Sequence, residues 1–151
     1  SGGGGAILDF GRPYTSRPSA MKGWADYRPA NVDGYCDAKY ASMKGKPDHS
    51  QIYVLLTDWD APRTVNTTTG NFIDVVNDPA IIGYGEVTYT ENTNGYVEFN
   101  IPIEYRNHRQ PKYVVVVCAA SKYGDYFTGG VGSVLYVDEL SFVFDSNVKW
   151  K

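Results

Sequence analysis

Residues 113–120, YVVVVCAA, form an eight-residue apolar run without a charged side chain on either face. Such a run is typical of a strand that is buried on both sides, and it predicts a position near the centre of a sheet. The next ten residues, SKYGDYFTGG, contain three aromatic rings, a lysine, an aspartate and three glycines. We expect residues 121–130 to form a loop on a rigid base, where function is often found; the alternative is a turn whose tyrosines cover the end of the core.

Alternating apolar and polar residues recur in residues 20–27, 51–58, 84–89 and 96–103. Clusters of Gly, Pro, Asn or Asp bound each stretch, as is typical of short strands. Many short strands with turns between them predict an all-β fold, an antiparallel β-sandwich of jelly-roll type.

Two local signals refine this prediction. The Asn94-Gly95 step favours a hairpin that joins the strand before it to the strand after it. Near the C-terminus, Leu135 and Val137 occupy odd-numbered positions, whereas the next apolar residues occupy even-numbered positions. In a regular strand the two sets would face opposite sides. A β-bulge near Asp138 and Glu139 would reconcile the two, because it inserts one extra residue into the strand.

The length of 151 residues predicts a single domain. We expect that domain to span residues 6–146, with a flexible glycine-rich N-terminus at residues 1–5 and a short tail at residues 147–151, since consecutive glycines are costly to order. Tyrosine accounts for 13 of the 22 aromatic residues. Its amphipathic side chain suits exposed recognition surfaces.

A formal net charge of −3 argues against nucleic acid as a partner. No apolar stretch approaches the roughly 20 residues that cross a membrane, so we expect no membrane insertion of this domain. We also expect no cofactor and no metal, because zinc and EF-hand spacings are absent. The alternative to a domain without metal is a calcium ion bound by Asp9, Asp138 and Glu139, which would link the first strand to the last. Cys36 and Cys118 are expected to be unpaired.

The candidate ligand-binding side chains fall on two segments. Trp59 follows a strand in the run TDWDAPR, where an indole could stack on a sugar ring while Arg63 binds hydroxyls. The loop after residue 120 supplies the others: Lys122, Tyr123, Asp125 and Tyr126. The alternative for Trp59 is a ring that caps the core.

Trp24 and Tyr27, in the run KGWADYRP, form a second aromatic candidate for ligand contact; packing in the core is the alternative. A third possibility is catalysis by paired carboxylates, as in glycoside hydrolases. The acids available for it are Glu86, Glu98, Glu104, Asp125 and Glu139, of which Glu86, Glu104 and Asp125 are the preferred set. Solvated acids on a sheet face are the ordinary explanation of such residues.

Five runs of the chain stand out in combination: DFGRPYTSRPSAMKGWADYRP, SQIYVLLTDWDAPR, IIGYGEVTY, FNIPIEYR and SKYGDYFTGGVGSVLYVDELSF. They resemble the "putative carbohydrate metabolism domain" family of exported Bacteroidetes proteins, over nearly the whole chain. The resemblance implies a jelly roll similar to carbohydrate-binding modules, located in the periplasm or on the outer cell surface as part of a larger protein. Ala25 departs from the family, which often has an aromatic residue there.

The resemblance implies contact with an oligo- or polysaccharide and leaves binding versus cleavage open. We expect a non-catalytic glycan-binding module. A glycoside hydrolase-like enzyme is the alternative, and a structural adhesion domain is a weaker one.

Overall fold

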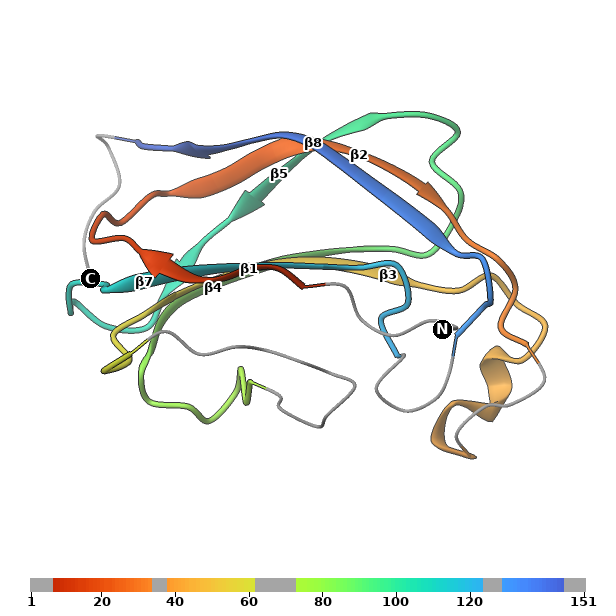
Figure 1. Ribbon diagram of the computed structural model, residues 1–151, viewed down its shortest axis with the longest axis horizontal. Helices are drawn as coiled ribbons and strands as arrows, with labels where there is room; N and C mark the ends of the chain where they lie inside the picture. The colour runs from red at the N-terminus through yellow and green to blue at the C-terminus, as the bar shows by residue number, and fades with distance from the viewer. Residues whose placement is uncertain (1–6, 34–37, 62–72, 124–128, 146–151) are drawn as a thin grey trace.

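A computed structural model describes residues 7–33, 38–61, 73–123 and 129–145; of residues 7–11 it describes the backbone alone. Among these residues, eight strands form two antiparallel sheets that lie face to face (Figure 1). The larger sheet has the order β1 (Ile7–Pro13), β7 (Tyr113–Ala119), β3 (Ser50–Thr57), β4 (Ile81–Tyr89) and β6 (Glu104–Tyr105). The smaller sheet has the order β5 (Val97–Pro102), β2 (Ala20–Arg28) and β8 (Val134–Val143).

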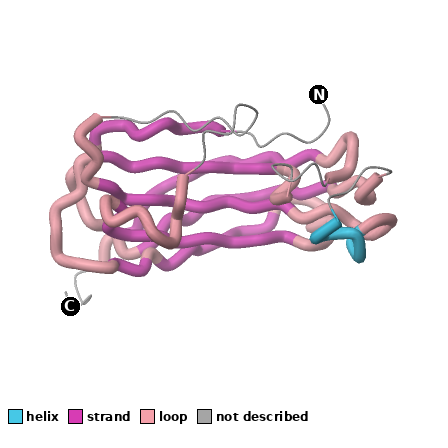
Figure 2. Tube along the Cα trace, turned by 90° about the horizontal axis from the view of Figure 1, so that it is seen from below, coloured by secondary structure: helices cyan, strands magenta, loops and turns pink. Residues whose placement is uncertain are grey.

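The predicted antiparallel β-sandwich of jelly-roll type is confirmed. In both sheets an early strand pairs with a late one, β1 with β7 and β2 with β8, so the chain's two halves are interleaved. Figure 2 shows the strands running along the long dimension of the molecule. The short 3-10 helix η1 (Ala38–Met43) lies in a connection at one end and was not anticipated.

The strand predicted to be buried on both faces is β7, an interior strand between β1 and β3. Its Val114, Val116 and Cys118 face the core between the two sheets. Val115 and Val117 face the other way, into a second apolar cluster with Leu55 and Trp59. This second cluster explains why apolar residues occupy both faces of β7 and no polar residue alternates with them.

The hairpin prediction at Asn94-Gly95 is wrong. Both residues do adopt positive φ angles, 57° and 111°, as the dipeptide favours. However, β4 belongs to the larger sheet and β5 pairs with β2 in the smaller one, so the turn carries the chain from one sheet to the other.

The bulge predicted near Asp138 and Glu139 is confirmed. Lys22 is opposite Ser141 and Trp24 is opposite Asp138, which leaves two residues of β8 opposite Gly23. Glu139 has a φ of 55°. The change of phase brings both Val137 and Phe142 against the core, whereas Leu140 stays 42% exposed.

Candidate functional site

The outer face of the three-stranded sheet carries three exposed aromatic side chains, Trp24, Tyr96 and Tyr136, which are 38%, 50% and 48% exposed. Strand β2 alternates here, so Met21 and Ala25 face the core while Lys22 and Trp24 face solvent. Because Ala25 faces inward, its small side chain does not interrupt the outer aromatic surface.

Strand pairing places polar residues beside Trp24. Across the sheet, Trp24 is opposite Glu98 of β5 and opposite Asp138 of β8. The next exposed position of β2, Lys22, is opposite Asn100 and Ser141. An aromatic ring in the middle strand therefore has acidic neighbours on both sides.

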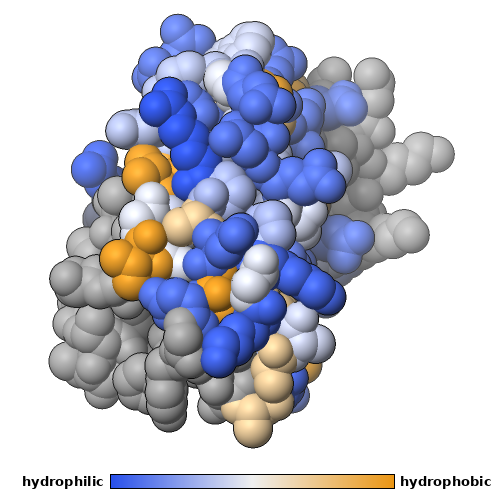
Figure 3. Space-filling model, turned by 90° about the vertical axis from the view of Figure 1, so that its right-hand side faces the viewer, coloured by the Kyte–Doolittle hydropathy of each residue, from blue (hydrophilic) through white to orange (hydrophobic). Residues whose placement is uncertain are grey.

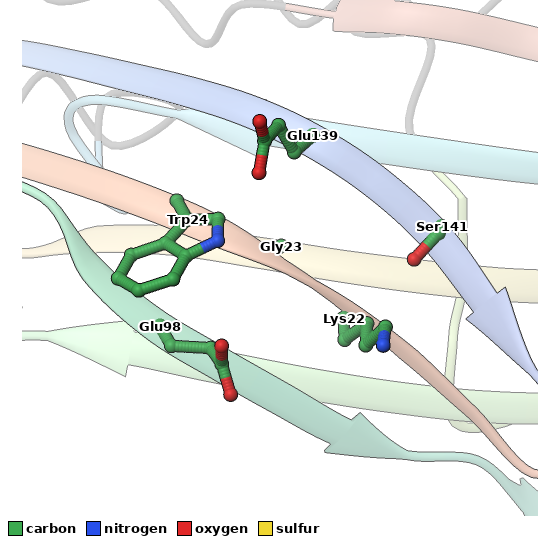
Figure 4. A pocket seen from close by; sticks show the side chains of 6 residues that line it. All are labelled: Lys22, Gly23, Trp24, Glu98, Glu139 and Ser141. Atoms are coloured by element: carbon green, nitrogen blue, oxygen red, sulfur yellow. The ribbon is translucent and has the colours of Figure 1, made fainter.

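A pocket of about 260 Å³ opens on this face. It is lined by Lys22, Gly23, Trp24, Glu98, Glu139 and Ser141. Figure 4 shows the indole ring of Trp24 between the carboxylates of Glu98 and Glu139, with Lys22 and Ser141 farther along the strands.

The bulge and Gly23 together shape the pocket. The bulge gives β8 the extra residue that presents Glu139 on this face. Gly23 has no side chain, and a Cβ there would lie 2.8 Å from Cζ of Phe99 and 3.1 Å from the carbonyl oxygen of Asp138. The close approach of Phe99 and β8 therefore requires glycine.

The charged groups of the pocket have no side-chain partner among the described residues. Within the part of the chain that the structure describes, no side chain forms a hydrogen bond or ion pair with Lys22 Nζ or with the carboxylates of Glu98 and Glu139. Other acids are engaged: Asp26 pairs with Arg28 and Asp58 with Arg109, each at 2.9 Å. The pocket's polar groups are thus available to a ligand.

The chemistry of this pocket suits a sugar. An exposed indole can stack on the apolar face of a pyranose ring. Carboxylates accept hydrogen bonds from hydroxyl groups, and an ammonium group donates to them. One aromatic surface with a few convergent polar groups is the usual composition of a small-molecule site.

The prediction that Trp59 stacks on a sugar ring is wrong. Trp59 is 2% exposed in the second apolar cluster, and its Nε1 donates a hydrogen bond to Asp78 at 3.0 Å. A buried indole has no face for a sugar. In addition, β3 and β7 pair from Gln51 with Ala119 to Thr57 with Tyr113, a segment about 20 Å long, and Trp59 follows one end of it while Lys122 follows the other.

Lys122 and Tyr123 lie at the η1 end of the sandwich, where Lys122 Nζ donates to Thr88 Oγ1 at 3.2 Å. The Tyr123 ring stacks on Tyr40 of η1 with centroids 4.4 Å apart. Figure 3 faces this end and shows mostly hydrophilic described residues between small, separate hydrophobic areas. Arg63, Asp125 and Tyr126 lie outside the described residues, so their ligand contacts stay predictions.

A buried carboxylate beneath these loops was missed by sequence reasoning. Asp48 is fully buried, and its Oδ2 accepts hydrogen bonds from Ser121 Oγ, the Gly130 amide and Ser133 Oγ at 2.5, 2.9 and 2.9 Å. Its Oδ1 accepts from the His49 amide. In the sequence, PDHSQ resembles an ordinary polar turn, and no local signal distinguishes it.

The second aromatic pair divides between the two faces of β2. Tyr27 is fully buried, contrary to the prediction of ligand contact, and its hydroxyl donates to the Ala120 carbonyl at 2.7 Å. Burial and the nearby Asp48 raise the Tyr27 pKa. Trp24, in contrast, is exposed on the pocket face.

The preferred catalytic acids Glu86 and Glu104 share the outer face of the other sheet, where Glu104 is opposite Tyr84. Glu86 is already engaged, because Oε2 accepts from Tyr84 and from Gln51 at 2.7 and 2.5 Å. Burial, followed by this contact with Glu86, raises the Tyr84 pKa. Asp125 lies outside the described residues, so its part in a catalytic pair stays a prediction.

Two classes of feature are absent from the described residues. No three His, Cys, Asp or Glu side chains among them approach closely enough to hold a metal ion. No described helix is long and apolar enough to cross a membrane. Cys118 is buried and free of a disulfide to any described residue, and burial raises its thiol pKa to about 12; Cys36 lies outside the described residues.

The chain belongs to the family described as Putative carbohydrate metabolism domain, whose model matches residues 4–143. It is similar to the crystal structure of a protein from Bacteroides thetaiotaomicron described as a putative glycoside hydrolase, with a TM-score of 0.66 and 21% identity. It is also similar to a protein from Bacteroides vulgatus with the same description, with a TM-score of 0.67 and 20% identity.

These two matches cover 93% and 90% of the chain but only 42% and 56% of the solved structures, so the chain spans about half of their length. At this identity the likeness shows a common fold. No protein of curated function matches the sequence. The chain is therefore a member of this family with a β-sandwich fold.

Proposed function

We propose that this domain binds an oligo- or polysaccharide on the outer face of its three-stranded sheet. The observation that carries the proposal is the pocket around Trp24, where an exposed indole lies between carboxylates that have no described partner. Family membership supports the substrate class, since the family is one of carbohydrate metabolism domains.

Tyr96 and Tyr136 extend the aromatic surface on either side of β2. Tyr136 of β8 is opposite Asp26 of β2, and the Arg28 guanidinium lies 5.4 Å from the centre of the Tyr136 ring. Several aromatic rings on one sheet face favour an extended chain of sugars over a single monosaccharide, because successive sugar rings can each stack on one aromatic residue.

The test is a glycan-array screen followed by calorimetric titration of the hits. Trp24→Ala should weaken binding by about 1 to 3 kcal/mol, the range for loss of a central aromatic anchor. Phe144→Ala is the matched control, because Phe144 is 60% exposed and does not line the pocket. Equal affinity of Trp24→Ala and the unaltered chain for a confirmed ligand would reject this site.

A second candidate function is glycoside hydrolysis, and the observation that favours it is the pair Glu98 and Glu139 on opposite sides of Trp24. Both are exposed, whereas the general acid of a glycosidase usually lies in surroundings that favour its protonated form. A reducing-sugar assay on each glycan hit decides between the two. Turnover that Glu98→Gln and Glu139→Gln both abolish would establish catalysis.

We further propose that the domain acts outside the cytoplasm, in the periplasm or on the outer cell surface, as part of a larger protein. The support is the resemblance to exported Bacteroidetes proteins and the greater length of the two solved structures. Fractionation of cells that express the natural protein tests it; recovery in the cytoplasm alone would reject it.

A further inference from the structure

We propose that the pocket around Trp24 selects glycans whose sugar rings carry a free, protonated amino group. This inference rests on the proposed function and names the ligand class of the same site. It comes from the charge of the pocket and from the position of the indole ring.

The balance of charge around Trp24 is acidic. Glu98 and Glu139 line the pocket, and Asp138 lies opposite Trp24 on β8. Lys22 is the lining residue of opposite charge. The opposite charges of the neighbouring ion pair Asp26–Arg28 cancel, so this pair leaves the net charge around Trp24 unchanged.

The carboxylates have unused capacity for a cation. Neither Glu98 nor Glu139 forms an ion pair or a side-chain hydrogen bond with any residue in the described ranges. A ligand ammonium group could therefore contact them without displacing an internal partner. A uronate or sulfate group would instead meet carboxylates of like charge, which is unfavourable.

The indole adds a second attraction for a cation. Tryptophan has the most favourable ring face for cation–π contact. Figure 4 shows the Trp24 ring between the two carboxylates, so an amino group on a stacked sugar would meet the ring face and a carboxylate together. A neutral sugar gains the stacking alone.

The experiment compares four probes by calorimetric titration of the whole 151-residue chain at about pH 6, where sugar amines are protonated. The probes are glucosamine hexasaccharide, N-acetylglucosamine hexasaccharide, galacturonic acid hexasaccharide and hexalysine. We expect the glucosamine chain to bind about tenfold more tightly than the N-acetylated chain, with the difference reduced at high salt. The galacturonic acid chain and hexalysine should bind more weakly than either.

Isosteric variants locate the effect. Glu98→Gln and Glu139→Gln should each reduce the preference for the glucosamine chain over the N-acetylated chain about threefold, because the amide removes the negative charge and keeps a hydrogen-bond acceptor. Glu104→Gln is the matched control, because Glu104 is also exposed but lies on the other sheet. Thermal melts of each variant confirm that the fold is retained.

Three results would overturn the inference. A glucosamine chain that binds no better than the N-acetylated chain would show that the pocket does not recognise the amine, and tighter binding of the galacturonic acid chain would reverse the proposed charge preference. Hexalysine that binds as tightly as the glucosamine chain would show recognition of charge without sugar. If Trp24→Ala still weakens another glycan hit, the proposed function stands although this inference fails; if no glycan binds in any screen, both fail.

Discussion

Trp24 and Trp59 show how surroundings decide what one residue type does. Both follow the same pattern of an aromatic residue among charged neighbours, KGWADY and TDWDAP. Trp59 lies against Leu55 and Val115 and satisfies its indole nitrogen with Asp78. Trp24 lies on the solvent face of β2, where its ring remains available.

Opposite effects on stability and binding are therefore expected for the two tryptophans. Trp59→Ala should lower the free energy of unfolding by about 3 to 5 kcal/mol, because it leaves a cavity and removes the hydrogen bond to Asp78 Oδ2. Trp24→Ala should lower it by about 1 kcal/mol or less, the usual range for a surface change. Urea unfolding of both variants measures the difference; similar losses would contradict this assignment.

At the scale of elements, connections and local irregularities place the site. The bulge in β8 turns Glu139 towards the pocket. Because Gly23 has no side chain, β8 and Phe99 can both lie close to it. At the η1 end, Asp48 links Ser121, Gly130 and Ser133, and its amide donates to the Ala30 carbonyl at 2.9 Å. Asp48 thus joins the connection between β2 and β3, in which it lies, to the connection between β7 and β8.

Asp48→Ala should lower the free energy of unfolding by about 3 to 5 kcal/mol, because several buried donors would lose their acceptor. Asp33→Ala removes an exposed aspartate of the same connection; it serves as the control and should change the free energy of unfolding by about 0.5 kcal/mol or less. Equal behaviour of the two variants in urea unfolding would refute a central contribution from Asp48.

For the whole molecule, one buried and two half-buried tyrosines predict sensitivity to alkaline pH. Burial is the largest cause that raises the pKa values of Tyr27, Tyr84 and Tyr105 above the ordinary 10.0. The folded state therefore holds these phenol protons more tightly than the unfolded chain does. Their stabilising contribution is complete below about pH 10 and is lost as the pH rises above it.

The melting temperature should consequently fall between about pH 10 and pH 12. Tyr27→Phe should be less stable near neutral pH, since it loses the hydrogen bond to Ala120, but should show a shallower decline in alkali. A pH series of thermal melts on both proteins provides the measurement. An unchanged slope in the variant would show that Tyr27 does not contribute to the transition.

The pattern along the chain determined the all-β sandwich, the interior strand β7 and the bulge at Asp138 and Glu139, because alternation and its phase depend on local residue order alone. It could not determine which strands pair. The Asn94-Gly95 turn has the backbone conformation that its residues favour, yet it joins different sheets, since pairing depends on which faces become buried.

Tertiary structure alone decided the site. Whether Trp59 or Trp24 is exposed depends on which connections cover each face, and no local pattern records that. Glu98, Glu139 and Trp24 come from three strands that are distant in sequence and meet only through the order β5-β2-β8. Individual acids and aromatics are visible in the sequence, but their convergence is a consequence of strand pairing, which acts between residues far apart along the chain.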